Sequence, residues 1–169
     1  MIFPKTDLTK ITIERSLEDE LAGENVIDIA EYRESEDGSN RISYYQLKHS
    51  TKHVHDPFSP SDLKETIEGF AERFTERMNE NDPPLPPDNV TFSIVTNRPF
   101  SEYFTTGLAA LQAGASVEAQ FQKTFETYTA LKGSDLQAFC RTLNLAGGEG
   151  NYRDQRHELH VELSALLAS

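Results

Sequence analysis

Three side chains suited to phosphodiester chemistry, Asp28, Gln46 and Lys48, lie in the first third of the chain. Hydrolysis of a phosphodiester needs a divalent cation held by oxygen atoms, and a nearby ammonium that orients the nucleophile or offsets developing charge. Asp28 offers a carboxylate and Gln46 offers a neutral oxygen. The backbone of Leu47 adds a carbonyl, and Lys48 supplies the ammonium.

Two strand-like segments must position these side chains. The alternation around Gln46 and Lys48 predicts a strand that presents both on one face, because side chains in a strand alternate with period two. The run from Val26 to Arg33 predicts a second strand with Asp28 near its start. Asp37-Gly38 is a strong turn signal between them, so we expect an antiparallel hairpin that brings Asp28 close to Lys48. The alternative is a solvated strand lysine and an edge-strand acid without a joint role.

A helix and a further strand are expected after the hairpin. Ser61 is suited to cap a helix whose apolar residues recur at helical spacing and should pack on the sheet. This stripe consists of Leu63, Ile67, Phe70, Ala71, Phe74 and Met78. Val90 to Thr96 alternates as a strand, which Asn97-Arg98-Pro99 ends.

Segments on either side extend the α/β pattern. Lys10 to Arg15 predicts a strand with Ile11 and Ile13 turned inward. Later segments predict two helices, a stretch that is either a strand or the end of a short helix, and a final amphipathic helix. These segments are Ser101 to Ala113, Ser116 to Lys132, Phe139 to Leu145 and Asp154 to Leu167.

The order of these segments resembles a known family. Asp28 followed by Q-L-K at Gln46 to Lys48 resembles the D-x(n)-(D/E/Q)-x-K signature of the PD-(D/E)XK nuclease superfamily, in its Q-x-K form. With Ser61 to Phe74 and Phe92 to Phe100, the region from about Val26 to Phe104 is similar to N-terminal nuclease domains of bacterial anti-phage effectors. Those effectors include antiviral STAND NTPases and nucleases associated with cyclic-oligonucleotide signalling.

The resemblance implies both a fold and an activity. The fold is α/β and restriction-endonuclease-like, with a central mixed sheet flanked by helices. The activity is metal-dependent cleavage of double-stranded DNA, with Asp28, Gln46 and Lys48 as catalytic residues. Mg²⁺ or Mn²⁺ would be held by Asp28, Gln46 and the carbonyl of Leu47, while Lys48 assists the attacking water.

The chain departs from the family's pattern at two places. Gln46 stands where an acid is more usual, so the metal site carries less negative charge. Only a short segment precedes Asp28, where the family usually has a long helix that often bears a metal-binding glutamate. Glu14 is the candidate for that additional carboxylate, with Glu18 and Glu20 beside it, and a solvated acidic face is the alternative.

Contacts with DNA phosphates are expected from His49, Lys52 and Arg98, because affinity for DNA comes largely from cations that neutralise phosphates. Arg98 has an alternative role as the partner of a carboxylate within the fold. The spacing H-x3-H-x-H at His49, His53 and His55 also permits a zinc cluster, although loop histidines more often face solvent or phosphate.

Composition and charge limit which partners and which location are expected for this chain. The formal net charge of -12 opposes DNA binding, so we expect help from homo-oligomerisation or from further domains of a larger effector. No apolar run approaches the length of a membrane span, and the amino terminus carries no secretory signal, which favours a cytoplasmic location without membrane contact. The single cysteine, Cys140, is expected to be a small buried hydrophobe.

Residues 1–169 are expected to form one nuclease-like domain, either complete or as the N-terminal part of a larger effector. A second hypothesis from another class stays open. In it the chain is a catalytically inactive nuclease-fold module used for binding or oligomerisation. Gln46 and the net acidity both favour this second hypothesis.

Overall fold

The computed structural model describes residues 8–13, 26–34, 38–79 and 86–148, and these residues form a mixed α/β fold. Its sheet has five strands in the order β1-β2-β3-β4-β5. The strands are β1 (Leu8–Ile13), β2 (Ile29–Glu34), β3 (Asn40–Lys48), β4 (Val90–Thr96) and β5 (Leu143–Ala146). The four helices are α1 (Lys64–Asn79), α2 (Glu102–Ala113), α3 (Ala119–Thr129) and α4 (Gly133–Thr142).

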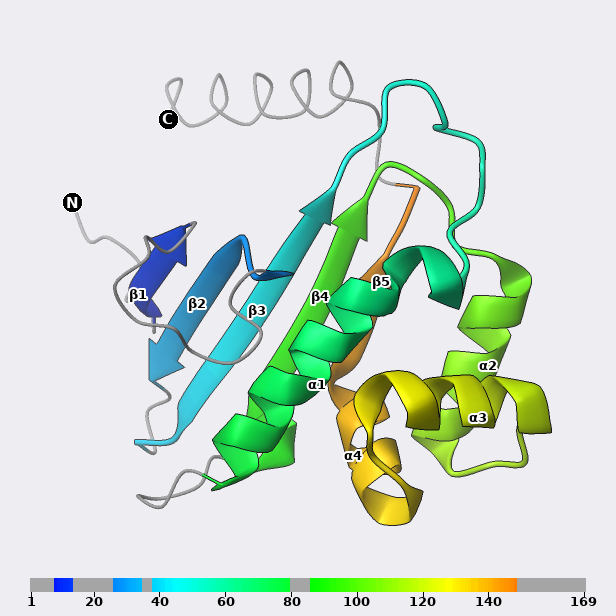
Figure 1. Ribbon diagram of the computed structural model, residues 1–169. Helices are drawn as coiled ribbons and strands as arrows, with labels where there is room; N and C mark the ends of the chain where they lie inside the picture. Colours follow the sequence, from blue (N-terminus) through cyan, green and yellow to red (C-terminus); the bar gives the residue numbers. More distant parts are fainter. Residues whose placement is uncertain (1–7, 14–25, 35–37, 80–85, 149–169) are drawn as a thin grey trace.

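The sheet changes from antiparallel to parallel at β3. β2 and β3 form the expected antiparallel hairpin, in which Ile29 pairs with Tyr45. β3 and β4 then run parallel, with Lys48 paired to Thr96. Parallel neighbours need a long crossover, and α1 provides it. α1 therefore begins at the end of the sheet where β3 and β4 finish, and runs back along the sheet (Figure 1).

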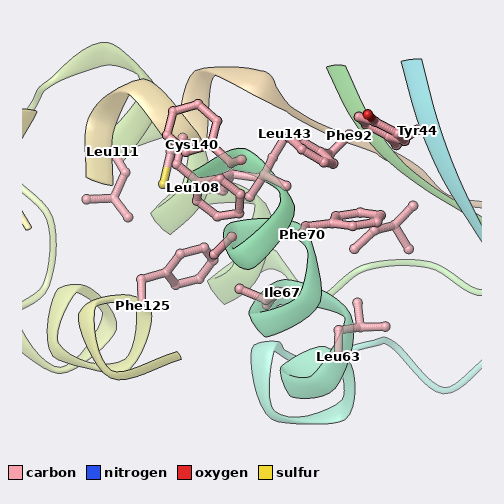
Figure 2. Packing of buried hydrophobic residues seen from close by; sticks show 14 of the residues in the cluster. Tyr44, Leu63, Ile67, Phe70, Phe92, Leu108, Leu111, Phe125, Cys140 and Leu143 are labelled. Atoms are coloured by element: carbon pink, nitrogen blue, oxygen red, sulfur yellow. The ribbon is translucent and has the colours of Figure 1, made fainter. Parts of the chain in front are cut away.

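α1 covers one face of the sheet with the apolar stripe expected from the sequence. In this stripe Ile67, Phe70, Ala71 and Phe74 of α1 are buried, as is Leu63 just before α1, while Met78 packs at the margin of the core. Phe70 lies over Phe92 of β4 with ring centroids 5.0 Å apart, and Tyr44 of β3 stacks on the same Phe92 at 5.2 Å. Figure 2 shows this aromatic layer beside α1. Burial of such large apolar rings stabilises the packing of α1 on the sheet.

The remaining helices gather beside β5 and extend the core (Figure 1). α4 contributes Phe139, whose ring lies 5.5 Å from that of Phe74. α2 and α3 meet through Phe104 and Phe125, at 6.1 Å. α2 begins as expected, because the hydroxyl of Ser101 accepts a hydrogen bond from the Phe104 N–H at 3.3 Å.

Two expectations about local structure are wrong. α1 is preceded by a short 3₁₀ turn that Ser59 caps in place of Ser61, because the Asp62 carboxylate accepts hydrogen bonds from the Ser59 N–H and hydroxyl at 2.8 and 2.6 Å. Ile11 and Ile13 are 53% and 68% exposed and do not point inward. The β1–β2 register aligns them with residues on the face of the sheet opposite α1.

Element boundaries differ elsewhere. α3 is shorter than the expected Ser116 to Lys132, and α4 continues to Thr142 before β5 begins, so Phe139 to Leu145 contains both a helix end and a strand. The expected helix from Asp154 to Leu167 lies outside the described residues. None of the helices in the described ranges is long and apolar enough to cross a membrane.

Candidate functional site

Asp28 stands immediately before β2 and faces the end of β3. Its N–H donates to the carbonyl of Tyr45 at 2.9 Å, which extends the hairpin beyond the first residue of β2. One carboxylate oxygen, Oδ2, accepts hydrogen bonds from Nε2 of Gln46 and from the N–H of Leu47, each at 2.5 Å. Oδ2 therefore joins a side chain and the backbone of β3 to the residue that precedes β2. The hairpin thus brings Asp28 into contact with Gln46, whereas the sequence analysis expected it to bring Asp28 close to Lys48.

Lys48 lies on the same face of β3 as Gln46 and Tyr44. Tyr44 and Gln46 are buried on the face covered by α1, and Lys48 follows two residues later with a half-buried side chain. Lys48 forms no ion pair with Asp28, although the structure describes both residues. The acid, the amide and the ammonium therefore share one end of the hairpin without a direct contact between the two charges.

The oxygen donors at this end suit a hard cation. In the described part of the chain, neither Oδ1 of Asp28 nor the amide oxygen of Gln46 accepts a hydrogen bond. One carboxylate with neutral oxygens fits Mg²⁺, which usually keeps several waters and takes one or two protein carboxylates together with substrate phosphates. Leu47 contacts Asp28 through its N–H, a contact that the sequence analysis did not anticipate.

Other expected metal ligands are less well defined. Glu14, Glu18 and Glu20 lie outside the described residues. Among the residues that the structure describes, no three histidine, cysteine or acidic side chains converge as a metal cluster, and His53 instead pairs through Nδ1 with Asp56 at 2.8 Å. Both partners of that pair are about two thirds exposed, at 66% and 65%.

Arg98 serves the fold. Its guanidinium lies 3.7 Å from the centre of the Phe58 ring, and its Nε donates to the carbonyl of Asp56 at 2.7 Å. The partner in this bond is a backbone carbonyl. Hydrogen bonds from Ser59 lower the pKa of the Asp62 carboxyl, and the Arg98 charge adds to this effect, in line with the expected role beside a carboxylate of the fold. Phe58 is itself joined to the segment after β4, because its N–H donates to Pro99 at 2.8 Å. Arg98 thereby fixes the loop that follows β3.

Asn97 joins the ends of β3 and β4. Its side chain accepts from the Ser50 N–H at 3.0 Å and donates to the Ser50 carbonyl at 2.8 Å. Both polar groups of the buried amide are thus used within the fold. These two bonds take the place of one further pair of backbone hydrogen bonds between β3 and β4. They therefore fix the direction in which the backbone leaves β3 after Lys48.

The expected DNA contacts His49 and Lys52 are exposed at the start of the same loop. Neither forms an ion pair with a described residue. They lie close in sequence to Lys48, so the loop keeps solvent-facing cationic or titratable groups at the end of β3.

Two arginines of α1 were missed by the sequence analysis. Arg77 donates through Nε to the Tyr44 hydroxyl at 2.8 Å, and the Arg73 guanidinium lies 5.6 Å from the centre of the Tyr44 ring. Arg73 also pairs with Glu76 on its own helix. Their positions, three and seven residues after Phe70, indicated that both lie on the same face of the helix as Phe70. Burial raises the pKa of Tyr44, so this hydroxyl is a neutral partner for Arg77.

Comparisons with known proteins leave the family open. No protein-family model matches this chain, and no curated protein matches it significantly. The contact between Asp28 and Gln46 is therefore the main structural clue to function.

Proposed function

We propose that this chain is a metal-dependent endodeoxyribonuclease that hydrolyses phosphodiester bonds of double-stranded DNA. One observation carries the proposal: the carboxylate of Asp28 contacts the amide of Gln46 at 2.5 Å, and Lys48 follows on the same face of β3. This arrangement gathers a carboxylate, a neutral oxygen and an ammonium at one end of a hairpin. Phosphodiester hydrolysis uses these three kinds of group together.

The topology supports a restriction-endonuclease-like core. An antiparallel unit β1-β2-β3 leads through α1 to the parallel strand β4. The acid precedes β2 and the Q-x-K sequence ends β3, in the order on which the resemblance to PD-(D/E)XK nucleases rests. In the same proposal the chain is an anti-phage effector domain that acts in the cytoplasm. It acts either as a homo-oligomer or together with further domains of a larger effector.

The proposed chemistry divides among the residues of the site. Oδ1 of Asp28 and the amide oxygen of Gln46 would hold Mg²⁺ or Mn²⁺, with the Leu47 carbonyl as a third oxygen. The cation supplies charge neutralisation and lowers the pKa of bound water. Lys48 orients the attacking water and offsets the negative charge that develops on the phosphate. Buried Gln46 keeps Asp28 in place through its hydrogen bond.

Plasmid cleavage tests the proposal. We expect the wild-type chain to nick supercoiled DNA when Mg²⁺ or Mn²⁺ is present and to stop when a chelator is added. Asp28→Ala and Lys48→Ala should each lower the rate by about 100-fold or more, because each removes a group that acts on the reacting phosphate or water. Gel electrophoresis of the nicked and linear products measures the rate.

Lys123→Ala is the matched control, since Lys123 is exposed on α3 and distant in sequence from the site. It should cleave like the wild type. Equal cleavage by the wild type and both site variants would trace the activity to a contaminating nuclease and end the proposal. Thermal unfolding of each variant separates loss of activity from loss of folding.

A specific observation also favours the alternative, a nuclease-fold module for binding or oligomerisation. Ile11, Ile13 and Leu47 are all about half or more exposed, at 53%, 68% and 48%, on the sheet face opposite α1. Exposed apolar side chains on one face are typical of an interaction surface. A wild-type chain that self-associates in sedimentation experiments but never nicks DNA with either cation would establish this alternative.

A further inference from the structure

A cavity of about 380 Å³ lies between α2 and the start of α3, on elements that the proposed nuclease site does not use. Its lining includes Tyr103, Gly107, Val117 and Phe121. The volume falls within the range of small-molecule sites, which are mostly apolar with a few polar groups. The cavity is open to solvent, and Tyr103 on its wall is 44% exposed.

Gly107 lets the Phe121 ring pack against α2 at the cavity wall. A Cβ at this position would lie 2.5 Å from the Phe121 ring, so α3 packs closely on α2 only because residue 107 lacks a side chain. The Tyr103 ring meets Phe121 edge to face, with centroids 5.2 Å apart. The two aromatic rings therefore form a fixed corner, and one of them, Tyr103, presents ring surface to solvent.

Two acidic residues, Glu102 and Glu118, also belong to the lining. Glu118 occupies the N-cap position of α3 but makes no capping hydrogen bond with its side chain, so the fold does not use this carboxylate as a cap. Its charge reaches the cavity wall: loss of hydration together with the Glu118 carboxylate raises the pKa of the Tyr103 hydroxyl. Among the lining residues that the structure describes there is no lysine, arginine or histidine.

We propose that this cavity is a binding site for a small organic cation, in which an ammonium or guanidinium group on an apolar body is held by the Tyr103 ring and the carboxylates of Glu102 and Glu118. An aromatic face attracts a cation through its quadrupole. The two carboxylates add charge complementarity and disfavour anions. Val117 and Phe121 contact the apolar body of the ligand.

Titration with benzyltrimethylammonium tests the site, with benzyl alcohol and benzoate as the neutral and anionic probes. Chemical shifts of the full chain, followed by NMR, should move at residues of α2 and α3 around the cavity, and only the cationic probe should saturate them. Glu118→Gln should weaken binding by about two- to fivefold, the range of an exposed charge pair. Tyr103→Leu keeps an apolar wall without the aromatic face and should weaken it by a similar factor.

Glu126→Gln is the control, because it removes one negative charge from the same helix outside the cavity lining. It should bind like the wild type. Equal binding of all three probes would show an unspecific apolar groove, and equal weakening by Glu118→Gln and Glu126→Gln would show only a general charge effect. Either result, or no saturable shift with the cation, overturns the proposal.

Discussion

At the scale of single residues, Asp28 has two roles that experiments can separate. Its Oδ2 accepts hydrogen bonds from Gln46 and Leu47, which stabilises the end of the hairpin, while its charge is what a metal ion would need. A carboxylate retained only for the fold can be replaced by any acceptor of the same shape. A carboxylate retained for a cation cannot.

Asp28→Asn and Asp28→Ala distinguish these roles. The alanine variant leaves the largely buried Gln46 amide without its acceptor and should lower the free energy of unfolding by about 1–3 kcal/mol. The asparagine variant keeps an acceptor oxygen and should lose less. Chemical denaturation measures both. If Mg²⁺ raises the melting temperature of the wild type, that increase should vanish in both variants; an increase retained by Asp28→Asn would place the cation elsewhere.

Gln46→Glu tests the reduced charge of the site. A second carboxylate beside Asp28 raises the pKa of one member of the pair. Because the folded pKa then exceeds the unfolded value, the variant should lose stability as the pH rises from about 4 toward neutral. Mg²⁺ should restore that stability at neutral pH. Thermal unfolding at several pH values with and without Mg²⁺ measures this, and a pH profile equal to that of the wild type would contradict it.

At the scale of elements, the start of α1 is controlled by the pair Ser59 and Asp62. Hydrogen bonds from the Ser59 hydroxyl and N–H lower the pKa of Asp62. A lowered folded pKa means that the stabilisation is present above the unfolded pKa and is lost as the pH falls through the folded pKa. The crossover between β3 and β4 therefore weakens at its first turn in acid.

Asp62→Asn tests this cap. The wild type should lose stability on acidification from about pH 4 downward, and the variant should show a flatter profile over the same interval. Carbon NMR of the side-chain carboxyl should give Asp62 a midpoint below the usual value for aspartate. Asp88→Asn, a change of an exposed acid outside α1, is the control. An ordinary midpoint for Asp62 would contradict the role given to Ser59.

The elements also show how far sequence patterns reach. Val90 to Thr96 and the stripe of α1 were predictable because alternation and helical spacing each fix which side chains are buried. Ser59 was missed because Ser61 offers the same local cap signal, and only the tertiary path of the loop selects between them. Ile11 and Ile13 were placed on the wrong face because alternation alone gives two opposite faces without saying which one α1 covers.

The same limit applies to the candidate site. The turn signal sufficed to predict the hairpin, since it depends on local sequence. The expected neighbour of Asp28 was Lys48, but the contact that forms is with Gln46. The use of Arg98 and Asn97 to fix the loop after β3 depends on contacts between segments more than forty residues apart in the chain, such as Asn97 with Ser50. No pattern of residue types in one window contains that information.

At the scale of the whole molecule, the net charge of -12 sets the conditions for DNA binding. Few cations are available near the proposed site, chiefly Lys48 and Lys52, so a divalent ion must offset much of the repulsion. Binding by the chain alone should then be weak and dependent on the divalent ion. A partner surface or a second copy would add the missing contacts.

Fluorescence anisotropy with a labelled DNA duplex measures the affinity of the chain for DNA. We expect affinity to appear only with the divalent ion, and the logarithm of affinity to fall with the logarithm of salt concentration with a slope of about -2 to -3, as two or three phosphate contacts require. Lys52→Ala should reduce the slope by about one. Tight binding without a divalent ion would contradict this account of the charge.

Burial of Cys140 has a practical consequence. The thiol is fully enclosed in the core, and loss of hydration raises its pKa to about 12, so almost none of it is thiolate at neutral pH. Because it is the single cysteine of the chain, alkylating reagents should modify the protein only when the core opens. The rate of that modification reports global unfolding, and a cysteine engineered on the surface would accept a fluorescent dye selectively.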